Sequence, residues 1–317
     1  MPKLKIALLS GGISGEREVS LKTGEQIFNA LDKAKYKIFK YDPKIDLKRF
    51  FNDAINKRFD LVFPALHGPF GEDGKLQGML DMINMPYVFS GCLASALAMD
   101  KYKTKIIAKS NGLTIAKDII LNKEENNYNI NKIIKQLSFP LVVKPVELGS
   151  SVGASIANTA QELKKGIKTA FKCDNRIMLE QFIAGRELSV AVVGEEQKAK
   201  ALPVIEIIPK ISKWFDYKAK YEMGGSEEVC PAEIPNGVKN EIQKLAVKIF
   251  QAIGCKDLAR ADFIWSKKNN KIYFLEINTI PGMTQTSLAP QAAKAAGIEF
   301  GEFLDQLISS ALNKKLC

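Results

Sequence analysis

Short apolar runs that end in glycine alternate with amphipathic stretches along the first hundred residues. KIALLSGG at 5–12 predicts a short buried strand that ends in a glycine turn, and residues 18–33 place apolar side chains near helical spacing. The alternation returns in FDLVFPALHG at 59–68, in helical GKLQGMLDMI at 74–83 and in strand-like PYVFSG at 86–91. We therefore expect an open parallel sheet whose functional loops lie at the carboxyl ends of its strands.

The pattern changes at about Asp100, where a helical segment at 100–112 is followed by strand-like runs at 139–145, 177–185 and 187–194. From about Gly185 onward a third region begins. It holds a polar excursion at 211–235, a helix at 238–254 and a hairpin, LARADFIWSKKNNKIYFLEIN, at 258–278. The sequence therefore predicts three regions with boundaries at 1–99, 100–184 and 185–317.

Length and composition are those of an ordinary globular protein. A chain of 317 residues suits two or three domains, and the net charge of +11 comes from lysines scattered along the whole length. No basic run or RNA-binding signature accompanies them, so we expect no nucleic-acid partner. No apolar run reaches the roughly 18 residues of a membrane span, so we expect no membrane partner either. Five widely spaced cysteines without a C-x-x-C pair indicate free thiols in a reducing cytoplasm.

The loop GSSVG at 149–153 has two interpretations. It fits the G-x-S-x-G pattern of a hydrolase nucleophile elbow, which would make Ser151 a nucleophile. That reading needs a histidine base later in the chain, whereas the only histidine, His67, comes before the loop. The hydrolase hypothesis is therefore disfavoured.

The second interpretation is a loop laid over a phosphate. Such a loop needs a backbone that can approach closely, small hydroxyl donors and a nearby cation. Gly149 and Gly153 supply the first requirement, Ser150 supplies a hydroxyl beside that of Ser151, and Lys144 ends the preceding strand. A glycine-serine loop alone is weak evidence, so this interpretation depends on finding a metal site elsewhere.

The hairpin supplies that candidate. If its turn is centred on Asn269, Asp262 lies opposite Glu276 and Arg260 opposite Asn278, and all four side chains share one face. Carboxylate and amide oxygens are the ligands that Mg²⁺ prefers. A surface salt-bridge patch is the alternative, but the apolar surroundings in IYFLEIN argue against a freely solvated strand.

Other nucleotide-binding motifs are absent from the sequence. The chain has no G-x-x-x-x-G-K-[ST], and its first loop, GGISGE, is not the G-x-G-x-x-G of a dinucleotide-binding protein. Glu16, near the start of a helix in this loop, would repel a phosphate and attract an ammonium group. Any ATP must therefore be held by a different architecture.

Five blocks together resemble one family. GGISGEREVSLKTG at 11–24, the segment 66–101, VVKPVELGSSVGAS at 142–155, FDYKAKY at 215–221 and the segment 259–288 are similar, in order and spacing, to the motifs of D-alanine–D-alanine ligases of the ATP-grasp superfamily. The resemblance extends over nearly the whole chain. It implies an α/β, three-domain ATP-grasp architecture.

In that architecture residues 1–99 form a Rossmann-like substrate-binding domain with an open parallel sheet. Residues 100–184 and 185–317 form two lobes that enclose ATP, the second lobe carrying the metal site and a lid loop. The implied reaction joins two D-alanine molecules through an acyl phosphate, for peptidoglycan synthesis. The resemblance also implies ATP, two Mg²⁺ ions with Mn²⁺ as a substitute, a cytoplasmic location and a homodimer.

The resemblance assigns roles residue by residue. Catalytic roles, which include holding the first amino group and stabilising the oxyanion, fall to Glu16, Ser150, Tyr221, Arg260 and Gly282. Substrate-binding roles fall to His67, Lys220, Ser287 and Leu288. ATP-binding roles, with Glu180 accepting the adenine amino group, fall to Lys101, Lys144, Ser151, Glu180, Gln181, Phe182, Ile183 and Glu187. Metal binding falls to Asp262, Glu276 and Asn278.

Two departures and one alternative accompany the resemblance. Leu148 stands where many relatives have glutamate, and Phe182 replaces a common tryptophan. Another ATP-grasp ligase would keep the nucleotide and metal residues without needing Glu16, Lys220, Tyr221 or Ser287. The presence of these four favours D-alanine, and the Lys220–Tyr221 pair favours an amine over D-lactate as second substrate.

Overall fold

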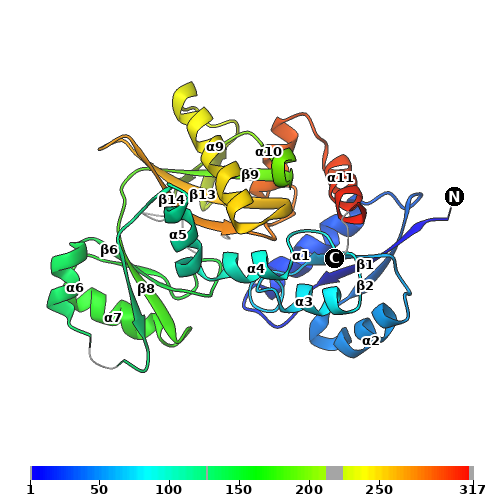
Figure 1. Ribbon diagram of the computed structural model, residues 1–317, viewed down its shortest axis with the longest axis horizontal. Helices are drawn as coiled ribbons and strands as arrows, with labels where there is room; N and C mark the ends of the chain where they lie inside the picture. Colours follow the sequence, from blue (N-terminus) through cyan, green and yellow to red (C-terminus); the bar gives the residue numbers. More distant parts are fainter. Residues whose placement is uncertain (1, 126–127, 212–223, 314–317) are drawn as a thin grey trace.

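Three β-sheets organise the chain. The structure is a computed structural model that describes residues 2–125, 128–211 and 224–313 (Figure 1). The predicted α/β class is confirmed, with one parallel sheet and two sheets that are largely antiparallel.

The N-terminal sheet has the strand order β2-β1-β3, with both pairings parallel as predicted. The middle of β1 is buried, since helices cover the sheet, and this explains its continuous apolar run. The elements of this region are β1 (Leu4–Ser10), α1 (Arg17–Ala30), β2 (Tyr36–Tyr41), α2 (Pro43–Ile55), β3 (Leu61–Ala65), α3 (Lys75–Met82) and α4 (Cys92–Met99).

The prediction of a strand in PYVFSG is wrong apart from one bridge between Val62 and Tyr87. Phe89 has a φ of +80°, and its N–H donates to the carboxylate of Asp257 at 2.7 Å instead of to a neighbouring strand. A tertiary contact has therefore overridden the local strand preference of this segment.

The central sheet has the order β5-β8-β6-β7, and all its pairings are antiparallel. Helices α6 and α7 lie together beside it (Figure 1), and their apolar residues share a core with Leu179 of β8. Because side chains alternate along a strand, the next residue, Glu180, faces the opposite side of the sheet. The elements are α5 (Lys101–Ser110), β4 (Thr114–Ile115), β5 (Asp118–Asn122), α6 (Ile130–Leu137), β6 (Leu141–Pro145), β7 (Ser155–Ala157), α7 (Ala160–Ala170) and β8 (Arg176–Gln181).

The third sheet has the order β12-β11-β9-β13-β14-β4, with β10 beside β9. Its last strand, β4, comes from the stretch between α5 and the central sheet, so the preceding region contributes one strand to this sheet. The remaining elements are β9 (Arg186–Glu195), a 3-10 turn (Glu196–Lys198), β10 (Lys200–Ala201), β11 (Ile205–Pro209), β12 (Ser226–Val229), α9 (Asn236–Ile253), β13 (Lys256–Ser266), β14 (Lys271–Asn278), α10 (Leu288–Ala295) and α11 (Phe300–Leu312).

The last helix, α11, returns to the N-terminal region (Figure 1). Phe303 and Ile308 on α11 belong to the same buried cluster as Ile6 and Leu8 of β1. This packing joins the C-terminal lobe to the N-terminal sheet, and the loops between them face a common cavity. The domain boundaries themselves stay a prediction.

Two further predictions concern bulk properties. Among the described residues, no helix has both the length and the apolar character needed to cross a membrane. The described cysteines are free thiols, as predicted: Cys92, Cys173, Cys230 and Cys255.

Candidate active site

A cavity of about 500 Å³ lies where the N-terminal loops meet the β13–β14 hairpin and the loop that follows it. Ten of the predicted site residues line it: Glu16, His67, Lys101, Ser150, Arg260, Glu276, Asn278, Gly282, Ser287 and Leu288. The structure therefore brings together residues that are more than 250 positions apart in sequence.

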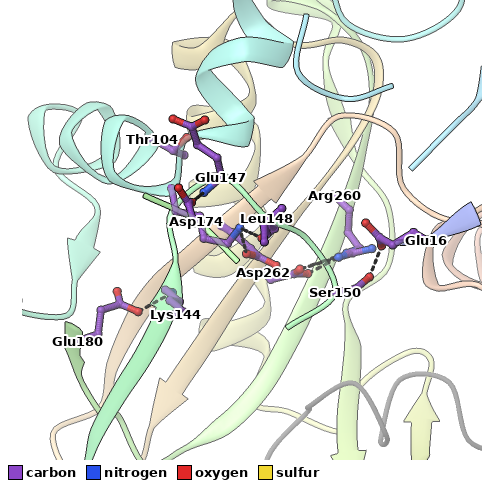
Figure 2. A network of polar contacts seen from close by, with 12 residues as sticks. Glu16, Thr104, Lys144, Glu147, Leu148, Ser150, Asp174, Glu180, Arg260 and Asp262 are labelled. Carbon is purple, nitrogen blue, oxygen red and sulfur yellow. Dashed lines mark hydrogen bonds and ion pairs between the residues drawn. The ribbon is translucent and has the colours of Figure 1, made fainter. Parts of the chain in front are cut away.

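Glu16 sits at the N-terminus of α1, where the positive end of the helix dipole favours its negative charge. The hydroxyl of Ser150 donates to its carboxylate, an interaction visible in Figure 2. A Cβ atom at Gly68 or at Gly149 would lie 2.8 or 2.9 Å from Glu16 Oε2. Glycine at these two positions therefore lets the carboxylate keep this place, and a Cβ atom at either would require the Glu16 side chain to shift.

The Gly/Ser loop adopts an unusual backbone. Ser150 and Ser151 both have positive φ angles, +53° and +58°, and Gly153 follows at +73°. Left-handed conformations are costly for residues other than glycine and occur often at functional sites. The loop thereby places the Ser150 hydroxyl on Glu16 in the wall of the cavity.

His67 does not support the hydrolase hypothesis. Its Nε2 atom lies 3.2 Å from the hydroxyl of Thr23, and its ring also bonds the backbone of Ile280. Burial lowers the pKa of the ring, and Arg260 acts in the same direction against the opposing effect of Glu16. The ring thus has Thr23 and Ile280 as its partners among the described residues, and its lowered pKa favours the neutral form near pH 7.

The predicted hairpin register is confirmed. Asp262 pairs with Glu276 and Arg260 pairs with Asn278 across β13 and β14. The register shifts between Asp262 and Phe263. A turn centred on Asn269 therefore accounts only for the pairs nearest the site, which are Arg260 with Asn278 to Asp262 with Glu276. Beyond this bulge the pairs are centred between residues 268 and 269, half a residue earlier.

Arg260 and Asp262 form a buried ion pair. The guanidinium Nη2 lies 2.8 Å from Asp262 Oδ2, and Ser189 of β9 donates to Oδ1 at 2.6 Å. Burial alone would lower the pKa of Arg260, but Asp262 outweighs it and the pKa is raised. Arg260 is therefore a permanent positive charge at the wall of the cavity.

The donor set at the hairpin fits a hard cation. Asp262 and Glu276 contribute paired carboxylates, and Asn278 contributes an amide oxygen that is held by the N–H of Ile280 at 2.9 Å. Among the described residues no cluster of three or more His, Cys, Asp and Glu side chains has the arrangement of a metal site, so the amide would have to complete this one. Oxygen donors with room for further ligands suit Mg²⁺.

Lys101 stands between the hairpin and the Gly/Ser loop. Asp100 caps α5 by accepting from the N–H of Lys103 at 2.9 Å, and this fixes Lys101 at the first helical position. Its ammonium donates to the carbonyl oxygen of Leu148 at 2.6 Å and lies 3.5 Å from Glu276. Because backbone supplies the Leu148 contact, the absence of a glutamate there does not alter it.

A second cluster, which we call the lysine–glutamate cluster, consists of Lys105, Lys144, Glu180 and Asp118. Lys144 lies 2.5 Å from Glu180 Oε2, and Lys105 lies 2.5 Å from Oε1 (Figure 2 shows the first pair). Burial would raise the pKa of Glu180, but Lys144 and Lys105 outweigh it and the pKa is lowered. The predicted acceptor for adenine is thus an ionised carboxylate.

The other residues predicted to hold adenine and ribose follow β8. Gln181 ends the strand, and its N–H donates to the carbonyl of Lys117 at 2.9 Å. Phe182 and Ile183 are half-buried in the connector, and Glu187 is half-buried in β9. These four residues lie outside the cavity of Glu16, on the side of the lysine–glutamate cluster.

The loop after the hairpin closes the far wall of the cavity. A Cβ atom at Gly282 would lie 2.8 Å from the hydroxyl oxygen of Ser287, so glycine keeps the backbone close to that side chain. The Ser287 hydroxyl lies 2.7 Å from that of Thr284, and Leu288 begins α10. Lys220 and Tyr221, predicted to act here, lie outside the described residues.

Two buried charged residues at the site were not predicted from the sequence. Lys105 lies one helical turn after Lys101, and this spacing was the available signal for it. Glu72, in a segment that reads as a turn, lines the cavity and accepts from the N–H of Gly68 at 2.7 Å. Nothing in the local sequence distinguishes it from the exposed carboxylates of other loops.

Comparisons with known proteins agree over the whole chain. The family model "D-ala D-ala ligase C-terminus" matches residues 107–309, and "D-ala D-ala ligase N-terminus" matches residues 40–92. The chain is 45% identical over 311 residues to the D-alanine–D-alanine ligase of Syntrophobacter fumaroxidans, covering 98% of both chains.

Solved structures give the same picture. The ATP complex of the D-alanine–D-alanine ligase from Bacillus anthracis matches with a TM-score of 0.83 and 32% identity, over 98% of this chain and 97% of that one. The VanG D-Ala:D-Ser ligase from Enterococcus faecalis also matches with a TM-score of 0.83 and 32% identity, over 98% of this chain and all of that one.

Proposed function

Because the chain belongs to the D-alanine–D-alanine ligase family, we propose that it joins two D-alanine molecules in an ATP-dependent reaction, with its two charged clusters dividing the work. The product, D-alanyl-D-alanine, is a building block of peptidoglycan. The observation that carries this proposal is a single cavity with an anionic end at Glu16 and a cationic wall at Arg260.

That arrangement suits an amino acid. An ammonium group bound by Glu16 would leave the carboxylate of the same molecule free to point toward Arg260 and the hairpin. Ser150 holds the Glu16 side chain in place and so orients the bound substrate. Tyr221 would fasten the lid over this end.

The nucleotide would lie across the lysine–glutamate cluster. Lys144 and Lys101 supply positive charge for the phosphates, and Glu180 accepts the adenine amino group. Asp262, Glu276 and Asn278 would hold Mg²⁺, which neutralises phosphate charge when bound.

The chemistry has two steps. A carboxylate oxygen of the first D-alanine bonds to the γ-phosphorus of ATP while the bond between that phosphorus and the bridging oxygen breaks, giving an acyl phosphate and ADP. The neutral amine of the second D-alanine then attacks the carbonyl carbon, and phosphate leaves as the peptide bond forms and the nitrogen loses a proton. Phosphorylation is required because a free carboxylate is a poor electrophile.

The chain's own groups act mainly on developing charge. Arg260 and the N–H of Gly282 would stabilise the oxyanion that forms on the attacked carbonyl. The carboxylate of the second D-alanine would be held by Ser287, Leu288 and Lys220. The neutral His67 would lie beside the first D-alanine. The site thus positions charges and excludes water, as expected for phosphoryl transfer.

Phosphate release from Mg·ATP tests the proposal. The purified protein is assayed with D-alanine, L-alanine, D-serine, D-lactate or no addition, and the condensed product is identified by mass. We expect release that depends on D-alanine and matches the formation of D-alanyl-D-alanine. A larger yield of the mixed D-alanyl-D-serine product would move the assignment toward the activity named for the VanG ligase.

Assembly and location follow from the family resemblance. We infer a homodimer in the cytoplasm, with Mg²⁺ replaceable by Mn²⁺. Sedimentation equilibrium tests the first inference, and the metal dependence of phosphate release after treatment with a chelator tests the last.

A further inference from the structure

Lys105 is the most completely buried lysine at the site, with 1% of its surface exposed. Its ammonium lies 3.0 Å from the carbonyl of Ala116, 2.8 Å from Asp118 Oδ1 and 2.5 Å from Glu180 Oε1. Two of its three N–H donors make the hydrogen bonds to Ala116 and Glu180, and Asp118 is its second ion-pair partner. Lys105 is therefore enclosed by protein groups and is not open to a ligand.

The two carboxylates that it contacts face each other directly. Asp118 on β5 pairs with Glu180 on β8, so their side chains emerge from the same face of the central sheet. Like charges in this position repel, and both are largely removed from water. Lys105, inserted from α5, is the cation that lies between them.

Lys144 is placed differently. Its ion pair among the described residues is with Glu180 Oε2, so it has N–H groups to offer to a ligand. If Lys144 turns toward a phosphate, Glu180 loses that partner, and Lys105 is the cation that still neutralises it. Lys144 can therefore leave Glu180 for a ligand, whereas Lys105 stays in its place beside Glu180.

We propose that Lys105 is a positioning residue for nucleotide recognition, which keeps Glu180 ionised and aimed as a hydrogen-bond acceptor while Lys144 moves to the triphosphate. The inference rests on the proposed function, because it takes Glu180 as the acceptor for the amino group of adenine. Lys105 itself does not touch the nucleotide.

This role has a specific consequence. Without Lys105, Glu180 would be a buried carboxylate facing Asp118, and it would take up a proton or turn away. A protonated carboxyl donates as readily as it accepts. It would then tolerate the 6-keto group of hypoxanthine in place of the 6-amino group of adenine.

The test compares ADP and inosine diphosphate binding by calorimetry, in the presence of Mg²⁺ and without amino acid. The wild-type protein should bind ADP more tightly. In Lys105→Met the ratio of the two dissociation constants should fall by about tenfold or more, since a lost acceptor removes the discrimination between the two bases. Lys105→Arg keeps the charge and should retain part of the ratio.

Lys109→Met is the matched control, because this exposed lysine lies one turn further along α5. Its ratio should equal that of the wild type. A folded Lys105→Met variant with unchanged discrimination would overturn the proposal, since a merely structural lysine would weaken both nucleotides equally.

A second variant covers the case in which Lys105→Met does not fold. Lys105→Gln removes the positive charge but keeps a polar side chain that can hydrogen-bond to Ala116 and Glu180 in place of the ammonium. Loss of discrimination in this variant supports the proposal, and retention contradicts it. Failure of the wild-type protein to bind either nucleotide would count against the proposed function instead.

Discussion

Two buried glutamates at opposite ends of the site show different ways of placing a carboxyl group inside a protein. Glu180 is 4% exposed and lies between Lys105 and Lys144, which together lower its pKa despite burial. Glu72 is 8% exposed and, among the described residues, its Oε1 atom has no hydrogen-bond partner. Burial and the nearby Glu16 raise the pKa of Glu72 well above its usual range.

The contrast shows that burial alone does not decide the charge of a carboxyl group. Desolvation acts on both residues in the same direction, and the cations that the fold supplies decide the outcome. The lysine–glutamate cluster, where we propose that the nucleotide binds, therefore carries full charges. Near Glu16, the raised pKa of Glu72 favours its protonated form, which would leave Glu16 as the principal attraction for the ammonium group of the proposed substrate.

The largest predicted effect is the loss of stability when the Glu180 carboxylate is removed. Glu180→Ala leaves Lys105 and Lys144 buried without that partner, so the free energy of unfolding should fall by about 3–5 kcal/mol. Glu72→Ala should cost clearly less, because it leaves no buried cation without its partner and removes a carboxyl group whose Oε1 atom has no hydrogen-bond partner among the described residues. Urea denaturation of both variants measures the difference, and equal losses would remove the distinction between the two glutamates.

A methyl group added at Gly282 tests the close packing of the cavity wall, whereas the previous prediction tests buried charge. Gly282→Ala places a Cβ atom against Ser287, so kcat/KM should fall by about tenfold to a hundredfold because the wall is displaced from the reacting carbonyl. The matched control is Gly237→Ala in the first turn of α9, where a Cβ would meet no atom within 4 Å. Steady-state kinetics should show no loss for the control. Equal losses of kcat/KM in the two variants would show that the space beside Gly282 does not determine activity.

The smallest predicted effect concerns the pH dependence of stability, to which Glu72 and Glu180 should contribute with opposite signs. Glu72 holds its proton more tightly when folded, so its contribution to stability is present below the ordinary value of 4.5 and is lost as the pH rises above it toward the folded pKa. Glu180 has a lowered pKa, so its contribution is present above 4.5 and is lost as the pH falls below it.

Glutamine substitutions isolate these contributions. Thermal unfolding of Glu72→Gln and Glu180→Gln, each compared with the wild type as a function of pH, should give differences with slopes of opposite sign, up to about 1.4 kcal/mol per pH unit. Slopes of the same sign would show that the two carboxyl groups do not differ in charge.

The sequence was sufficient for contacts set by local periodicity. Strand alternation together with a turn centred on Asn269 predicted that Asp262 lies opposite Glu276, and the structure confirms that pairing. The parallel N-terminal sheet followed from apolar runs that end in glycine, and it is confirmed too. The functional roles of the individual site residues stay predictions.

Contacts between distant elements were not predictable from the sequence. Lys105 and Glu180 are 75 positions apart, and they meet because α5, which packs against β4, β14 and α9, also reaches the central sheet through the Lys105 side chain. Phe89 turns out of a strand because Asp257, far along the chain, captures its N–H. Glu72 could be recognised as a site residue only from its burial, because a glutamate flanked by glycines is typical of an exposed turn.

The bulge after Asp262 separates the hairpin into two parts that can vary independently. The tip at residues 267–270 is exposed, and the pairs next to it are shifted by one residue from the register of Asp262 with Glu276. Because the bulge absorbs this shift before the site is reached, changes of length at the tip need not propagate to the face that carries Asp262 and Glu276. The tip is consequently a natural attachment point for a reporter group, from which motions of the C-terminal lobe can be followed in a working enzyme.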